Sequence, residues 1–246
     1  MGARRVFGSG AAYAVCVNGL AIRVAQARVG DVASLVEWRR VHGDDIPRPL
    51  LERLDAGLAE GAAWKFAPLR LFPQLAEIAL DNDLVLWRMP EAIARWLEHG
   101  SGGGPCVIAA DMVACFGQFT PLCGPEPRNT GLRGMPPGFD AARALAEVLE
   151  LCPDAQLRGE VDEQGLQVAI LSRPSPPLVV TTEEVSICSP FPGHARSLGT
   201  CGAHFVGLNM RQPRPQYGCD AAVLERIAAN WDELRPHIER HVGTLR

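Results

Sequence analysis

An acidic triplet, Asp81-Asn82-Asp83, lies between two apolar segments of the chain, residues 78–80 and 84–87. Carboxylates beside buried, strand-like segments are unfavourable unless their charge is compensated, and a divalent cation is the usual compensation. In an extended strand, side chains two residues apart point the same way but lie about 7 Å from each other. A turn at Asn82 would bring both carboxylates onto one ion, which could then hold a diphosphate. The triplet therefore predicts a metal site at the end of a strand.

Composition and charge narrow the class of protein further. The chain has 246 residues, of which 47% are hydrophobic, so it is long enough to form a large globular domain. Its formal net charge of −4 argues against nucleic acid as the main partner. The eight cysteines form no C-x-x-C pair, which argues against structural zinc and favours reduced thiols. No segment reaches the ~18 apolar residues of a membrane span. The start of the chain is more typical of a buried strand than of a secretion signal, so we expect a cytoplasmic protein.

Helical and strand patterns alternate through the first two-thirds of the chain, which predicts an α/β domain with a mixed sheet. We expect strands over residues 13–17, 78–80, 84–87, 106–110, 168–171 and 178–181. We expect helices over residues 31–38, 50–58, 90–99, 140–151 and 221–242, with a bend at Pro236 in the last. Irregular structure is expected over residues 64–75, 117–127 and 129–137. Because no repeat or linker is visible, residues 1–246 are expected to form a single domain.

Four segments in this order resemble parts of GT-A fold glycosyltransferases, the nucleotide-sugar-dependent class that carries an Asp-x-Asp motif. They are Trp64–Leu71 leading into the acidic triplet, Asn129–Leu132, Asp162–Gln164 and Gly202–Gly207. The second resembles a strand beside the donor sugar, the third an acidic segment after the next helix, and the fourth a His-Phe-x-Gly segment. The resemblance implies a GT-A fold, with a mixed, mainly parallel central sheet flanked by helices. It also implies transfer of a hexose from a nucleotide-diphosphate donor, by resemblance UDP, to an unknown acceptor hydroxyl.

The resemblance also implies a metal site. Asp81 and Asp83 would bind Mn²⁺ or Mg²⁺, with His204 as a third ligand, and the imidazole would shift the preference toward Mn²⁺. An ion that bridges both phosphates of the donor would stabilise the departing nucleoside diphosphate. For His204, a core histidine bonded to a carbonyl is the alternative.

The remaining site residues follow from the other matched segments. Asp162 is the preferred candidate for activating the acceptor hydroxyl or positioning the sugar, with Glu163 second. The alternative is that both begin a helix, where acidic residues are favoured. Lys65 and Arg70 are candidates for diphosphate contacts, and solvated surface positions are their alternative. Contacts to the nucleotide or the sugar are further expected from Asn18, Asn82, Asp111, Asn129, Gly131 and Gln164.

Two other functions stay open. A nucleotidyltransferase would use a similar sheet and metal, but it usually carries a Gly-rich loop with basic residues after the first strand. This chain has Asn18-Gly19-Leu20 there, which counts against that function. A degenerate GT-A domain that binds a partner or a sugar without transferring it also stays open, because the N-terminal half is short for complete nucleotide binding. The absence of metal-dependent nucleotide binding would favour such a domain.

Overall fold

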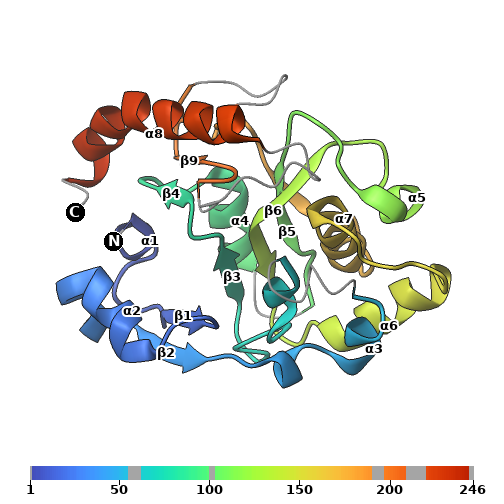
Figure 1. Ribbon diagram of the computed structural model, residues 1–246. Coiled ribbons are helices and arrows are strands. Elements are labelled where there is room, and N and C mark those ends of the chain that lie inside the picture. Colours follow the sequence, from blue (N-terminus) through green and yellow to red (C-terminus); the bar gives the residue numbers. More distant parts are fainter. Residues whose placement is uncertain (1, 55–61, 100–102, 190–196, 209–219, 244–246) are drawn as a thin grey trace.

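A computed structural model describes residues 2–54, 62–99, 103–189, 197–208 and 220–243 of the chain (Figure 1). Its centre is a four-stranded sheet in the order β3 (Glu77–Leu80), β6 (Arg128–Met135), β5 (Val107–Ala110) and β7 (Leu178–Val180). β7 is parallel to β5, whereas β6 is antiparallel to both β3 and β5. The sheet is therefore mixed, as predicted, since β3, β5 and β7 run in one direction and β6 runs in the opposite direction. β6 returns beside β5 after only the short helices η4 (Gly117–Phe119) and α5 (Thr120–Cys123), without a long crossover helix.

Strand β6 shows that the prediction of an irregular segment was wrong for residues 129–135. Glycine has a low strand preference, but a paired strand on each side supplies backbone hydrogen bonds that outweigh it. The register with β5 shifts, since Ile108 is opposite Arg133 while Ala109 is opposite Asn129. Residues 130–132 therefore form a bulge, and a bulge bends a strand and changes where its side chains point.

Helices cover both faces of the central sheet. Successive residues of β5 point to opposite faces. Ile108 packs in one apolar cluster with residues of α6 (Ala141–Leu151) and α7 (Glu160–Leu171), whereas Val107 and Ala109 pack with α4 (Glu91–His99). The predicted strand over residues 168–171 was wrong, because these residues are the last turn of α7. A short apolar run suits a buried helix as well as a strand, and periodicity alone does not separate the two.

A second, three-stranded sheet continues from the acidic triplet. Its order is β4 (Leu84–Leu86), β9 (Gly202–His204) and β8 (Val185–Ile187), with β9 antiparallel to β4 and parallel to β8. The long helix α8 (Ala221–Val242) lies along this sheet, in red in Figure 1, with the bounds that the sequence predicts. Phe205 packs edge-on against Trp231 of α8, with their ring centroids 4.9 Å apart. The strands β8 and β9 were not predicted from the sequence.

The N-terminal unit comprises α1 (Gly2–Phe7), β1 (Ala14–Val17), α2 (Ile22–Val29), η1 (Gly30–Leu35) and β2 (Glu37–Arg40). β1 and β2 pair in parallel, and only Val17 of β1 is buried, so the expectation of a buried first strand was wrong. The predicted helix over residues 31–38 was also wrong. η1 ends at Leu35 and Val36 is extended, because the next four residues gain hydrogen bonds by pairing with β1.

The described residues between the N-terminal unit and β3 include the short helices η2 (Gly43–Asp45), α3 (Arg48–Leu51) and η3 (Ala62–Phe66). Of the predicted helix over residues 50–58, residues 50–51 belong to α3 and residues 52–54 do not continue it, whereas residues 55–58 lie outside the described residues. Within the described part of the chain, no helix is long and apolar enough to cross a membrane.

Candidate active site

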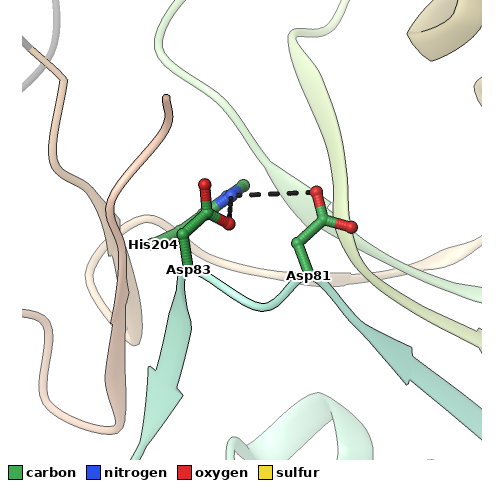
Figure 2. A group of neighbouring side chains, drawn as sticks. All are labelled: Asp81, Asp83 and His204. Carbon is green, nitrogen blue, oxygen red and sulfur yellow. Dashed lines mark hydrogen bonds and ion pairs between the residues drawn. The ribbon is translucent and has the colours of Figure 1, made fainter. Parts of the chain in front are cut away.

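The three residues that the sequence predicts as metal ligands lie together where the two larger sheets meet. Asp81 follows β3 and Asp83 precedes β4, and the Leu84 N–H donates to the Asp81 carbonyl at 3.2 Å, which closes a turn around Asn82. His204 ends β9 and is opposite Leu84 in the β4–β9 pair. Figure 2 shows the two carboxylates and the imidazole facing one another. One ligand atom from each residue lies within 4.8 Å of the others.

The chemistry of this group suits a divalent cation. His204 Nε2 is 3.2 Å from Asp83 Oδ1 and 4.0 Å from Asp81 Oδ2, so two carboxylate oxygens and one ring nitrogen converge on one point. Asp83 and His204 are 7% and 4% exposed, so their polar atoms are shielded from water. Carboxylate oxygens suit Mg²⁺ and Mn²⁺, and an added imidazole nitrogen is common for transition metals. The residues present therefore fit the metal that the GT-A resemblance implies.

Strand β6 passes directly beneath the imidazole. The Asp81 N–H donates to the Gly131 carbonyl at 2.7 Å, which ties the acidic triplet to the bulge. A Cβ at Gly131 would lie 2.2 Å from His204 Cε1 and 2.6 Å from its Nδ1, so only glycine leaves room for the ring. His204 Nδ1 has no hydrogen-bond partner within the described residues. Packing against Gly131, and not a second hydrogen bond, therefore holds the ring in place.

Asn129 and Asp111 continue this group along the sheet. The Asn129 side chain accepts a hydrogen bond from the Gly131 N–H at 2.8 Å and donates one to Asp111 Oδ2 at 3.0 Å. Asn129 is 5% exposed, and Asp111 follows directly after β5. The structure thus connects three of the predicted contact residues into one hydrogen-bonded row beside His204.

A second set of charges surrounds Asp81. Lys65 Nζ, from η3, lies 2.9 Å from Asp81 Oδ2 and 3.5 Å from Glu163 Oε2. Glu163 lies in the first turn of α7, is 3% exposed, and accepts a hydrogen bond from Gln167. Arg133 Nη1 lies 3.8 Å from the other oxygen of Asp81. Arg133 was not predicted as a site residue, because it lies in the segment that was expected to be irregular.

These charges shift the pKa values of Asp81, Lys65 and Glu163. Burial alone would raise the pKa of Asp81, but Lys65, Arg133 and His204 outweigh it and hold that pKa below its usual value of 3.8. Burial alone would lower the pKa of Lys65, but Glu163 and Asp81 raise it above its usual value. Burial raises the pKa of Glu163, against the opposing effect of Lys65. Asp81 is therefore ionised and available as a ligand.

Asp162, the preferred of the two acidic residues, makes hydrogen bonds with the backbone. Its Oδ1 accepts the Gln118 N–H at 3.0 Å, and its Oδ2 accepts the Arg158 N–H at 2.9 Å. Neighbouring residues on a helix point about 100° apart, so only one of the pair can face Asp81. Glu163 is that residue, through Lys65.

Arg70 makes its hydrogen bonds away from the metal group. Its guanidinium donates to the carbonyls of Pro136, Phe139, Phe72 and Leu75 at 2.8 to 3.2 Å, and its side chain is 5% exposed. This network holds the loop before β3 against the end of β6, so the structure does not bring Arg70 to the metal group. Gln164 donates to the Cys115 carbonyl at 3.2 Å, Asn18 is half-buried after β1, and Asn82 is exposed at the tip of its turn.

A cavity adjoins the charged side of the site. Its volume is about 1030 Å³, and its lining residues include Lys65, Asp81, Asn82 and Arg133. The N-terminal unit and β3 supply most of the other walls. The cavity is in the size range of ligand pockets, so a large substrate could approach Asp81 from this side.

A mixed sheet between helices, with a carboxylate pair at a strand end, is the arrangement of the GT-A fold. No family model matches the chain, and no curated protein matches it in sequence. Among solved structures, it is similar to the galactosyltransferase LgtC, determined in complex with donor and acceptor sugar analogues. The match covers 90% of this chain and 84% of the LgtC chain, with a TM-score of 0.51 and 12% sequence identity. At this identity the likeness concerns the fold, and it confirms the predicted GT-A fold.

Proposed function

We propose that this chain is a metal-dependent glycosyltransferase that moves a hexose from a nucleotide-diphosphate donor to an acceptor hydroxyl. The observation that carries the proposal is the convergence of Asp81, Asp83 and His204 at one point of a GT-A fold. A bound divalent ion would neutralise the donor diphosphate and so stabilise the leaving group. An imidazole among the metal ligands favours Mn²⁺ over Mg²⁺. UDP is the nucleotide that the resemblance favours.

The residues around the metal group would bind the phosphates and the sugar of the donor. In the proposed reaction, the bond between the anomeric carbon and the diphosphate oxygen breaks, and the nucleoside diphosphate leaves with the electron pair. The acceptor oxygen forms the new bond and loses its proton. Lys65 and Arg133, both beside Asp81, place positive charge where the phosphate oxygens would lie. Asn129, held by Asp111, offers an amide beside His204 for sugar hydroxyls.

Glu163 replaces Asp162 as the proposed carboxylate nearest the reacting groups. It is the acidic residue of α7 that reaches the Asp81 group through Lys65, whereas both oxygens of Asp162 accept backbone N–H groups. Its raised pKa suits a group that takes up or hands on a proton. We propose that Glu163 orients the donor sugar or the acceptor hydroxyl.

Calorimetry with UDP and GDP, with and without Mn²⁺, tests the proposal. Asp83→Asn should lose metal-dependent nucleotide binding and turnover of the matching nucleotide-sugar while keeping its circular dichroism spectrum. Asp44→Asn is the matched control, since it removes one carboxylate from an exposed position. Nucleotide affinity that changes neither on removal of Mn²⁺ nor in Asp83→Asn would refute the proposal. Metal-dependent binding without turnover of any nucleotide-sugar would instead favour a degenerate GT-A domain.

A further inference from the structure

Lys65 occupies the oxygen of Asp81 that a metal ion would use. Its Nζ lies 2.9 Å from Asp81 Oδ2, and this same oxygen lies 4.0 Å from His204 Nε2. A divalent ion between Asp81 and His204 would therefore meet the ammonium group at close range. Two like charges at that range repel strongly where water is partly excluded. The ion and the ammonium thus compete for one carboxylate oxygen.

Glu163 gives the ammonium a second partner. Its Oε2 is 3.5 Å from Lys65 Nζ, and its carboxylate accepts a hydrogen bond from Gln167 one helical turn further along α7. Glu163 is 3% exposed and belongs to a helix of the core, so it does not follow Lys65 if the lysine moves. A lysine has a long aliphatic stem with rotatable bonds, so its ammonium can leave Asp81 without leaving Glu163.

We propose that Lys65 is the counter-ion of Asp81 in the metal-free site, and that it couples metal binding to diphosphate binding. When an ion is bound, the Lys65 ammonium would leave Asp81 and would bind a phosphate oxygen of the donor instead. This inference rests on the proposed function, since it takes the nucleoside diphosphate as the second ligand. The coupling is reciprocal, so the nucleotide raises the affinity for the metal by the same factor as the metal raises the affinity for the nucleotide.

The proposal predicts a weak site for metal alone. Without a diphosphate, the ion has to displace the ammonium from Asp81, and the displaced ammonium gains no new partner. With a diphosphate present, the displaced charge gains a new partner. Couplings between two ligands of one site commonly amount to about 5- to 150-fold in affinity. Removal of the lysine should therefore tighten the binding of metal alone and reduce the gain that the nucleotide brings.

Mn²⁺ titrations of the full chain measure both quantities. The electron paramagnetic resonance signal of free Mn²⁺ reports metal binding, first alone and then with UDP or GDP. Lys65→Met should bind Mn²⁺ alone at least about fivefold more tightly than the wild type, with a smaller gain on adding nucleotide. Arg133→Met is the matched control. This variant also removes one positive charge beside Asp81. The guanidinium of Arg133, however, lies 3.8 Å from Asp81 Oδ1, the oxygen that faces away from His204.

A double variant controls for destabilisation of the fold. Lys65→Met leaves the buried Glu163 carboxylate without its cation, which would lower stability. Lys65→Met/Glu163→Gln removes both charges together and avoids this unpaired carboxylate. If neither variant binds Mn²⁺ more tightly than the wild type, the inference is overturned. An equal gain in Arg133→Met would also overturn it, because the effect would then be general electrostatics. A wild-type chain that binds Mn²⁺ neither alone nor with a nucleotide would instead remove the proposed function itself.

Discussion

Gly131→Ala tests whether packing against Gly131 positions His204, the proposed third metal ligand. The new Cβ would lie 2.2 Å from His204 Cε1 and 2.9 Å from Asn129 Oδ1, whereas ordinary contacts begin at 3.4 Å. The imidazole therefore has to move by about 1 Å, several times the tolerance of about 0.2 Å in a metal–ligand distance. Loss of the support behind a ligand typically costs about 10- to 100-fold in metal affinity. That corresponds to about 1.4 to 2.7 kcal/mol.

The assay is calorimetric titration of Mn²⁺ into the variant in the presence of UDP, beside a thermal melt. Overpacking of this kind should also lower stability by about 1 to 3 kcal/mol, so a control for stability is needed. Gly134→Ala provides it, because its Cβ would press on Val107 and Trp96 at 3.1 to 3.4 Å, in the core and not at the site. Wild-type metal affinity in Gly131→Ala, or the same loss in Gly134→Ala, would refute the reasoning.

Three further predictions separate structural from functional charges. Asp162→Ala should lower stability in urea by about 1 to 2 kcal/mol, since the Gln118 and Arg158 amides lose their acceptor, and should leave Mn²⁺ affinity unchanged. Arg70→Met should lower the free energy of unfolding by about 3 kcal/mol or more, because buried carbonyls lose their hydrogen-bond donor. The folded fraction should bind nucleotide normally, and weaker binding would show that Arg70 belongs to the site. In metal-free buffer, Asp81→Asn should remove stability that is fully present above pH 4. This difference in melting temperature should vanish as the pH falls through the lowered pKa of Asp81, and a pH-independent difference would contradict the assignment.

The metal group could be predicted because its signal is local. Asp81 and Asp83 interrupt two apolar segments, and the cost of burying a carboxylate makes that interruption informative without any knowledge of the fold. His204 required the resemblance, since it lies 121 residues from Asp83 and nothing nearby in the sequence marks it as a ligand. The sheet pairing that brings them together is a property of the whole fold.

The errors have a common physical origin. Whether Asp162 or Glu163 faces the site depends on the rotation of α7 about its axis, and the positions of both residues within a polar segment leave that rotation undetermined. Arg133 was missed for a related reason. Its strand contains glycines that weaken the local strand signal, and it is extended because β3 and β5 pair with it on either side. Tertiary contacts thus overrule local preference where the site is built.

The pairing of β9 with β4 also determines when the site can exist. The carboxylates precede most of the chain, but the imidazole that completes the group is added only after residue 203 has been made and has reached β4. Contacts between distant parts of a chain form late, because a long loop has to close first. Mn²⁺ binding during refolding should therefore trail the appearance of helical structure. The metal would bind to a chain whose folding is essentially finished, and its uptake would serve as a signal of completion.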